Sequence, residues 1–409
     1  MHYHYLIIGG GIAGVTAAEV IRTHHPDARI GIVSNEPHVI YSRVLLPHYL
    51  KRRIPRANLF LRTAEEFTLK KIDLHQEEII VSIDPKHKDV SCENGKTFGY
   101  DKLLLASGGS VKEWGKSEDA QVVYRLQTLD DADRLGDALP SLKRPLVVGS
   151  SFISLEFLEI FLANKIVPTL LVRDAHFFGH LIDAQGGELM HENFLRLGIA
   201  VDYDDTIVHV ERKTDKEVEV TTKNFKKITA DAIAVGVGID RNMAYARESG
   251  FDASEHGIRV NEYLETNYPE VYAAGDVAEF YDVISRKHRV VGNWTSAVLQ
   301  GKRAGLNMMG MREPFSSVPS YSITNLGFQI TALGDISNHA DAVVRMDKAH
   351  RQYERFFFEE NVLAGAVLIN RFADKAHLAK LIEQHTDMSQ WREQMSNNSF
   401  DIHTIPVVV

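Results

Sequence analysis

The chain has 409 residues, of which 44% are hydrophobic and 25% charged, a composition typical of a soluble globular protein with two or three domains. The formal net charge of -9 argues against a nucleic-acid-binding protein, because such proteins present a basic domain. A single cysteine, Cys92, excludes an intramolecular disulfide, a CxxC redox pair and a site with several thiolate ligands.

The N-terminal sequence predicts a cytoplasmic protein. The first strand is expected within a few residues of Met1, and no basic segment, apolar run and cleavage site precede it. No apolar stretch reaches the ~18 residues that a membrane helix needs. The single cysteine agrees with a reducing compartment. We therefore expect no membrane association.

The first predicted unit is "YLIIGGGIAGVTAAEVI", residues 5–21, which reads as a strand, a glycine turn and a helix. Gly9, Gly11 and Gly14 satisfy the GxGxxG pattern for a tight turn, close approach to a pyrophosphate and close helix packing. The helix N-terminus then faces the pyrophosphate charge. Glu36 ends the next strand, at the spacing expected for a ribose-binding acid.

The next segment, residues 78–109, reads as strands separated by turns at Asp84-Pro85 and Asn94-Gly95. This pattern predicts a sheet layer rather than a helix. Cys92 lies within it, where we expect a buried and inert thiol.

Residues 146–162, "LVVGSSFISLEFLEIFL", repeat the design of the first unit with serines at two of the three glycine positions. Gly149 keeps the tight turn, whereas Ser151 and Ser154 replace the other two glycines. Serine is small and the helix N-terminus stays available, so we expect a second dinucleotide site. A hydrolase nucleophile elbow is not supported, since GxSxG requires glycine at Ile153.

The strand after the second turn ends "TLLVRD". Arg173 occupies the position where an NADH-preferring protein carries an acid, and it favours NADPH because arginine accepts a 2'-phosphate. Asp174, the next residue, opposes that phosphate. Further on, His176, His180 and His191 do not form the HExxH pattern, so we expect no metal site.

The last part of the chain completes the pattern. "VYAAGD", residues 271–276, predicts a buried strand that closes on a small-residue turn, and a helix follows at residues 294–309. From about residue 313 the sequence predicts a third, antiparallel domain with helices on it.

With "LLLASGG" (103–109) and "VYAAGD", the first glycine turn resembles the FAD-dependent pyridine nucleotide oxidoreductases, in the branch of the rubredoxin, ferredoxin and nitrite reductase flavoproteins. The resemblance implies an α/β fold of two Rossmann-like (doubly wound, three-layer) nucleotide-binding domains and a small α+β C-terminal domain. The expected divisions are an FAD-binding domain at 1–118 and 242–312, an NAD(P)H-binding domain at 119–241, and a C-terminal domain at 313–409. A homodimer is compatible with this plan.

The resemblance also implies roles for single residues around FAD. Ser107 and Gly108 belong to the crossover between the domains, and the backbone of Val81 meets the adenine. Gly275 and Asp276 bind the ribityl chain, which agrees with a carboxylate at the carboxyl end of a strand in an open sheet.

The segment "YSRVLLPHYLKRR", residues 41–53, resembles the family's stretch that runs under the flavin. Arg43 is expected on the FAD pyrophosphate. His48 stands where one branch has a lysine near flavin N5, and Glu156 matches the glutamate that pairs with it, so we expect a His48 to Glu156 pair. Trp294 is a candidate for the wall of the nicotinamide pocket, with plain core packing as the alternative.

The electron acceptor is restricted by what the flavin segment lacks. It carries no cysteine, which argues against disulfide and cysteine-dependent peroxide chemistry. A cluster of basic residues in a protein of negative net charge favours a small carrier protein as the electron acceptor. A solvated helical face explains the same cluster equally well. The cluster comprises Lys51, Arg52, Arg53, Arg56 and Arg62.

The sequence thus predicts a reductase that passes electrons from NADH or NADPH through FAD to a small acidic carrier such as rubredoxin or ferredoxin. The alternatives are an NAD(P)H oxidase that reduces dioxygen, and a non-enzymatic FAD-binding sensor or assembly module.

Overall fold

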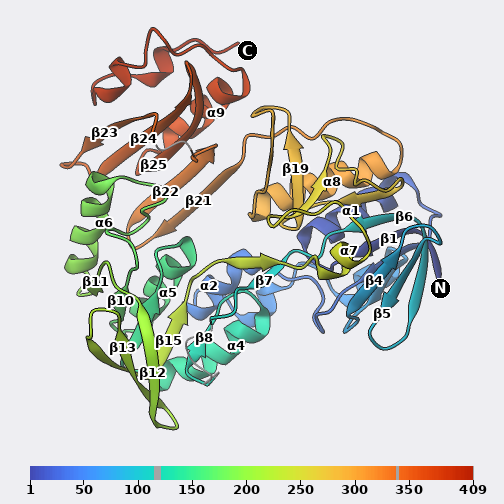
Figure 1. Ribbon diagram of the computed structural model, residues 1–409, viewed down its shortest axis with the longest axis horizontal. Coiled ribbons are helices and arrows are strands. Elements are labelled where there is room, and N and C mark those ends of the chain that lie inside the picture. Colours follow the sequence, from blue (N-terminus) through green and yellow to red (C-terminus); the bar gives the residue numbers. More distant parts are fainter. Residues whose placement is uncertain (115–120, 338–339, 409) are drawn as a thin grey trace. The chain divides into compact units, whose positions relative to one another are not determined.

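The computed structural model describes residues 1–114, 121–337 and 340–408, and it divides into two compact units (Figure 1). Unit 1 comprises residues 1–42, 57–110 and 240–319, and unit 2 comprises residues 43–56, 111–239 and 320–409. The chain passes between the units within β7 (Gly109–Val111) and β16 (Ile239–Arg241). No helix among the described residues is long and apolar enough to cross a membrane.

Unit 1 is built on a parallel sheet in the order β3-β2-β1-β6, with β18 pairing β6 on its other side. The antiparallel strands β5 and β4 extend the amino-terminal half of β6. The strands are β1 (His2–Ile8), β2 (Ile30–Val33), β3 (Ile72–His75), β4 (Ile80–Asp84), β5 (Asp89–Cys92), β6 (Thr97–Leu105) and β18 (Val271–Ala273). A smaller sheet holds β17 (Ile258–Val260), β19 (Ala278–Asp282) and β20 (Lys287–Arg289). The helices are α1 (Ile12–His24), α3 (Ala64–Leu69), α7 (Ala244–Glu248) and α8 (Trp294–Met308).

Helices α1 and α8 pack closely in unit 1 because small residues line their contact. A Cβ atom on Gly301 would lie 2.2 Å from the carbonyl oxygen of Ala13, and one on Gly305 would lie 3.0 Å from that of Ala17. The helices therefore approach with backbone against backbone. This contact places the middle of α8 against the first half of α1.

Unit 2 contains a second parallel sheet in the order β11-β10-β9-β15, with the short strand β8 at its edge, and an antiparallel sheet β12-β13-β14. Its strands are β8 (Val123–Tyr124), β9 (Pro145–Val148), β10 (Thr169–Leu171), β11 (Ala200–Asp202), β12 (Ile207–Thr214), β13 (Glu217–Thr222), β14 (Lys227–Ala230) and β15 (Ala232–Val235). The helices are α2 (Leu46–Leu50), α4 (Leu129–Ala138), α5 (Phe152–Ala163) and α6 (Ala184–Arg196).

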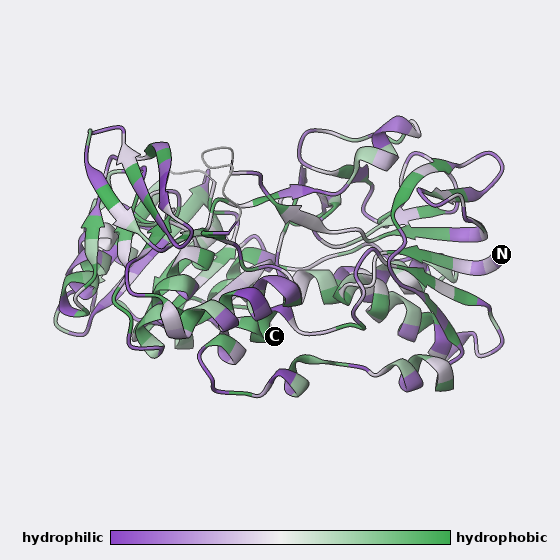
Figure 2. Cartoon of the chain, turned by 90° about the horizontal axis from the view of Figure 1, so that it is seen from below, coloured by the Kyte–Doolittle hydropathy of each residue, from purple (hydrophilic) through white to green (hydrophobic). Residues whose placement is uncertain are grey.

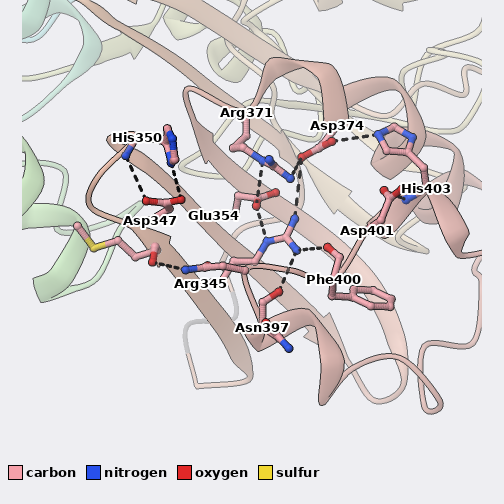
Figure 3. A network of polar contacts seen from close by, with 12 residues as sticks. Arg345, Asp347, His350, Glu354, Arg371, Asp374, Asn397, Phe400, Asp401 and His403 are labelled. Carbon is pink, nitrogen blue, oxygen red and sulfur yellow. Dashed lines mark hydrogen bonds and ion pairs between the residues drawn. The ribbon is translucent and has the colours of Figure 1, made fainter.

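The C-terminal part of unit 2 is an antiparallel sheet in the order β21-β22-β25-β24-β23. Its elements are β21 (Ser320–Asn325), β22 (Phe328–Gly334), β23 (Ala342–Asp347), β24 (Gln352–Glu359), β25 (Val362–Ile369) and α9 (Lys375–Glu383). Arg345 on β23 lies directly opposite Glu354 on β24 and bonds to its carboxylate. The Arg345 guanidinium also donates to the carbonyl oxygens of Asn397 and Phe400, so it anchors the C-terminal tail on the sheet (Figure 3).

Hydropathy follows this architecture in both units. Hydrophobic stretches lie along the central strands and inner helix faces, and the connecting loops are mostly hydrophilic (Figure 2). Strands β2, β9 and β15 of the parallel sheets are apolar and buried over their whole length, as expected of strands covered on both faces.

Candidate functional site

The first glycine turn has the geometry of a pyrophosphate cradle. Gly9 adopts a φ of 117°, and a Cβ on it would lie 2.1 Å from the carbonyl oxygen of Ala106, so only glycine fits. A Cβ on Gly14 would lie 2.1 Å from the Gly9 carbonyl oxygen. Gly11, in contrast, meets nothing within 4 Å and has no side-chain cap on α1. The open space at Gly11 and the uncapped helix end suit a bound phosphate.

The carboxyl ends of the parallel strands in unit 1 meet at one edge, and the predicted FAD residues follow them. Glu36 follows β2, Ser107 and Gly108 follow β6, and Gly275 and Asp276 follow β18. Open parallel sheets bind their ligands at this edge. The structure thus brings together in unit 1 the residues that the sequence predicts for the ribose, the crossover and the ribityl chain.

Glu36 and Ser107 are already engaged in hydrogen bonds. The Tyr41 hydroxyl donates to the Glu36 carboxylate at 2.6 Å. The Ser107 hydroxyl donates to the Asn242 carbonyl oxygen at 2.6 Å and lies 2.8 Å from the Tyr245 hydroxyl. Burial raises the pKa of Tyr245, so this phenol is a neutral partner. Ser107 therefore holds the returning chain against β6.

Helix α8 is held through Gln300 at the turn that carries Gly275 and Asp276. The Gly275 N–H donates to the Gln300 side-chain oxygen at 2.8 Å, and Asn293 caps the helix by accepting from the Ser296 N–H at 2.8 Å. Trp294 is the first residue of α8 and is half-buried. Its role beside the nicotinamide remains a prediction.

Val81 lies at an irregularity of β4. The β4-β5 register shifts between Ile80 and Ser82, so Val81 has no partner in the ladder, and the residue is 40% exposed. A bulge of this kind leaves backbone polar groups available. This geometry is compatible with adenine recognition by the Val81 backbone, which remains a prediction.

The second turn, in unit 2, keeps the tight bend but closes its helix end with serines. Gly149 adopts a φ of 118°. Ser151 caps α5 by accepting from the Ser154 N–H at 3.2 Å, and its hydroxyl donates to the Gly236 carbonyl oxygen at 2.9 Å. A serine hydroxyl has one proton, so this hydrogen bond commits the donor that the sequence interpretation assigned to phosphate. The hydrogen-bonding groups at the N-terminus of α5 are therefore already used within the protein, whereas the sequence predicts that they are available to a phosphate.

The strand end after the second turn carries an exposed ion pair. The Arg173 side chain is 83% exposed and lies 3.5 Å from Asp174. Asp174 also accepts a hydrogen bond from the Ser150 hydroxyl at 3.2 Å. Arg173 is accessible to a ligand, but its nearest carboxylate competes with a 2'-phosphate.

Glu156 is paired with Lys51 rather than with His48. The Lys51 ammonium lies 3.4 Å from Glu156 and 2.5 Å from Glu159, and the lysine side chain is 1% exposed. No hydrogen bond or ion pair joins His48 to Glu156 among the described residues. The direct pair expected from the sequence is therefore not formed, and Lys51, three residues after His48, contacts Glu156 in its place.

Burial sets the protonation properties of this cluster. Desolvation raises the pKa of Glu156, and the Lys51 charge opposes that rise. Desolvation together with the charges of Lys51 and Arg53 lowers the pKa of His48. His48 is thus favoured as a neutral imidazole, whereas the family resemblance places a cation at this position.

The other cations of the flavin segment are also engaged. Arg43 donates to the Gln127 carbonyl oxygen at 2.9 Å. Arg53 lies 3.5 Å from Glu159, and Arg56 lies 2.8 Å from Asp133, both in unit 2. In unit 1, Arg62 pairs with Glu19 at 2.7 Å. The prediction of an exposed basic cluster is wrong for Lys51, because this residue is buried. The positive charges of Arg53, Arg56 and Arg62 are balanced by neighbouring carboxylates.

Cys92 is buried in β5, as the sequence predicts. Burial raises the pKa of its thiol to about 11. The thiolate is therefore scarce at neutral pH, and this cysteine is a poor redox nucleophile.

Sequence reasoning missed two features of these sites. The sequence alone indicates a surface position for Lys51. The signal for its pairing is the spacing, because Lys51 lies three residues after His48 and Glu159 lies three residues after Glu156. Residues three apart share one face of a helix. The bond from Ser151 to Gly236 joins residues far apart in sequence, and no local pattern signals it.

Residues 3–301 match the model of the pyridine nucleotide-disulphide oxidoreductase family, and residues 319–386 match the rubredoxin NAD+ reductase C-terminal domain. The chain therefore belongs to the pyridine nucleotide-disulphide oxidoreductase family. It is an oxidoreductase that uses FAD and a pyridine nucleotide, as this family does. The resemblance inferred from the motifs and the predicted fold class are confirmed.

Similar curated proteins include the ferredoxin-NAD(+) reductase component of the 3-phenylpropionate/cinnamic acid dioxygenase from Photorhabdus laumondii, 27% identical over 92% of this chain and 95% of the relative. The NADH-rubredoxin oxidoreductase of Clostridium acetobutylicum is 25% identical over 92% of this chain and 94% of the relative. Among solved structures, a ferredoxin reductase from Rhodopseudomonas palustris has a TM-score of 0.90 at 24% identity, covering 98% of this chain and 99% of that one. This structural likeness shows the fold.

Proposed function

We propose that this chain oxidises NADH or NADPH and passes the electrons through FAD to a small redox carrier protein of the rubredoxin or ferredoxin type. The observation that carries the proposal is the combination of the family match over residues 3–301 with the rubredoxin reductase C-terminal match over residues 319–386. FAD supplies two-electron acceptance from the nicotinamide and one-electron release to a carrier.

The assignment of the domains is part of this proposal. We propose that residues 1–118 and 242–312 bind FAD and that residues 119–241 bind the nicotinamide dinucleotide. Residues 313–409 form a supporting C-terminal domain. The open turn at Gly11 supports the first assignment. The repeated strand, turn and helix at Gly149 supports the second.

The protein's own residues then have distinct tasks. In unit 1, Gly9, Gly11 and Gly14 form the cradle for the FAD pyrophosphate, Glu36 binds the ribose and Asp276 binds the ribityl chain. In unit 2, Lys51 and Glu156 form the buried ion pair of the segment that the family places under the flavin. Val81 and Trp294 are the remaining candidate residues of unit 1, and Arg43 and His48 are those of unit 2.

We propose NADH as the preferred donor. Several similar proteins carry NAD or NADH in their names, and the Asp174 carboxylate at this strand end is of the type that accepts from a ribose hydroxyl and repels a 2'-phosphate. This choice departs from the preference for NADPH that Arg173 alone suggests. Comparing the bimolecular rates of flavin reduction by NADH and NADPH decides between them.

The whole proposal is tested by anaerobic stopped-flow spectroscopy of the FAD-loaded protein. Reduction by NADH, followed by reoxidation on addition of rubredoxin or ferredoxin, is the expected result. A flavin that NADH and NADPH leave oxidised contradicts the nicotinamide assignment. A reduced flavin that transfers no electrons to either carrier contradicts the acceptor.

An NAD(P)H oxidase is the second candidate, because an NADH oxidase of Methanocaldococcus jannaschii is 26% identical over 79% of this chain. Adding dioxygen instead of carrier to the reduced protein separates the two. Reoxidation by dioxygen that is faster than by either carrier favours the oxidase.

An acidic carrier, a cytoplasmic location and a homodimer complete the proposal. Carrier reduction that slows as ionic strength rises supports an electrostatically guided encounter. Cell fractionation tests the location. Sedimentation velocity of the FAD-loaded protein tests the dimer.

A further inference from the structure

Two arginines in unit 2 converge on one neutral oxygen. The Arg196 guanidinium, at the end of α6, donates to the Asn193 side-chain oxygen at 2.7 Å. The Arg351 guanidinium, in the turn between β23 and β24, donates to the same oxygen at 2.6 Å. The two donating Nη2 atoms are therefore at most about 5 Å apart, a distance at which like charges repel.

Neither arginine has a carboxylate partner. Within residues 1–114, 121–337 and 340–408, no Asp or Glu oxygen lies within ion-pair distance of Arg196 or Arg351. Glu188 pairs with Lys348 at 2.9 Å and Asp347 with His350 at 2.7 Å. Glu192, four residues before Arg196 on α6, is exposed and forms no ion pair with either arginine in the described part of the chain. Desolvation, and then the Arg196 charge, lowers the pKa of Arg351. Among the described residues, the two guanidinium groups thus have no carboxylate in direct contact.

The pair is held in place by its surroundings. Asn193 is 2% exposed, and its amide nitrogen donates to the Leu326 carbonyl oxygen at 3.0 Å. The Arg351 guanidinium lies over the Phe328 ring, 4.3 Å from the ring centre. Asn370 donates to the Arg351 carbonyl oxygen at 2.8 Å. Contacts with the C-terminal sheet therefore hold Asn193 and Arg351 in place, whereas Arg196 is exposed and is held by its bond to Asn193. Helix α6 and this sheet are adjacent in Figure 1.

This arrangement is separate from the second dinucleotide turn. Gly149 follows the carboxyl end of β9, whereas α6 ends at Arg196, just before the amino end of β11. Strands β9, β10 and β11 are parallel, so the two places lie at opposite edges of this sheet.

We propose that Arg196 and Arg351 form a binding site for a dianionic phosphate group. Each guanidinium donates one hydrogen bond to Asn193. Its remaining N–H groups can donate to the oxygens of a tetrahedral oxyanion. Two positive charges with no carboxylate in direct contact match a phosphate dianion better than a single carboxylate. The Asn193 oxygen sets the spacing of the two guanidinium groups.

The test is calorimetric titration of the FAD-loaded, full-length protein with inorganic phosphate at low ionic strength. Saturating NAD+ is present so that the dinucleotide sites are filled. Replacing either arginine, by Arg196→Gln or Arg351→Gln, is expected to weaken phosphate binding about 10- to 100-fold, because each removes charge-assisted hydrogen bonds. The matched control, Lys302→Gln, removes an exposed cation from α8 and leaves the affinity unchanged.

A purely structural clasp between α6 and the C-terminal sheet is the rival explanation, and thermal melting without phosphate separates the two. The proposal expects Arg196→Gln to melt no lower than the unaltered protein, because repulsion is relieved while glutamine still donates to Asn193. Acetate in place of phosphate is expected to bind at least tenfold more weakly, and glycerol phosphate to bind as well as inorganic phosphate if the natural ligand is a phosphate monoester. A protein that does not bind phosphate, or variants that bind it unchanged, overturn the proposal.

Discussion

Lys51 on the C-terminal end of α2 and Glu159 on α5 form a buried ion pair at 2.5 Å, and Glu156 shares the same ammonium at 3.4 Å. One branch of the family that the sequence resembles is expected to have a lysine at the position of His48. The structure supplies the positive charge from three residues further along. Glu156 therefore has a positively charged partner, but this partner is Lys51 and not the residue at position 48.

Replacing Lys51 by methionine is expected to destabilise the protein by at most about 3–5 kcal/mol, because two largely buried carboxylates lose their shared counter-ion while Glu159 keeps Arg53. Thermal melting of the variant measures the loss. The control is Arg52→Met at the neighbouring exposed position, which is expected to change stability by less than about 0.5 kcal/mol. Equal losses in the two variants contradict a buried ion pair.

The raised pKa of Glu156 predicts a pH-dependent stability. A carboxyl whose folded pKa exceeds its unfolded value stabilises the fold below the unfolded pKa, near 4.5, and that stabilisation is lost as pH rises through the folded pKa. Glu156→Gln removes this dependence. The melting temperature of the variant minus that of the unaltered protein is therefore expected to increase from pH 5 to pH 8. A difference that is constant over this range refutes the raised pKa.

Much of the fold was predictable because its signals are local. The spacing of Gly9, Gly11 and Gly14 identifies a strand, a turn and a helix within a few residues, and the repeat at Gly149 identifies the second sheet. The partners of charged residues were not predictable, since they depend on tertiary contacts. Lys51 reads as one member of a basic run, and only the packing of α2 on α5 shows that it is buried.

Gly14 and Gly11 are expected to fail in different ways when changed to alanine. At Gly14 the new Cβ meets the Gly9 carbonyl oxygen at 2.1 Å, so the variant loses both stability and FAD. At Gly11 the new Cβ meets nothing within 4 Å, so the apoprotein melts as before but binds FAD more weakly. The ratio of flavin to protein absorbance and the melting of the apoprotein measure the two effects. A Gly11→Ala variant with full flavin content shows that the pyrophosphate does not lie against this turn.

Arg345 is expected to be the residue on which the C-terminal tail depends. Its side chain is 2% exposed, and it joins Glu354 to the carbonyl oxygens of Asn397 and Phe400 (Figure 3). Arg345→Met leaves the Glu354 carboxylate buried without its closest cation, which costs about 3–5 kcal/mol. Faster proteolytic cleavage after residue 386, detected by mass spectrometry, is the expected result. Lys227→Met, which removes an exposed ion pair with Glu219, is the control and is expected to cost under about 1 kcal/mol.

Ser151 is expected to limit the affinity for the nicotinamide dinucleotide. Its hydroxyl oxygen accepts a hydrogen bond from the Ser154 N–H, and its hydroxyl proton is donated to the Gly236 carbonyl oxygen. The end of the helix is therefore already capped where a pyrophosphate is expected to bind. Glycine at a helix N-cap costs only a few tenths of a kcal/mol relative to serine, so Ser151→Gly is expected to fold normally. We expect this variant to bind NADH about three- to tenfold more tightly, because the Ser154 N–H becomes available to the phosphate. Flavin-reduction kinetics over a range of NADH concentrations measure the change, with Ser150→Ala as the control that leaves the cap intact. Weaker binding by Ser151→Gly means that the hydroxyl turns towards the dinucleotide and contributes to its site.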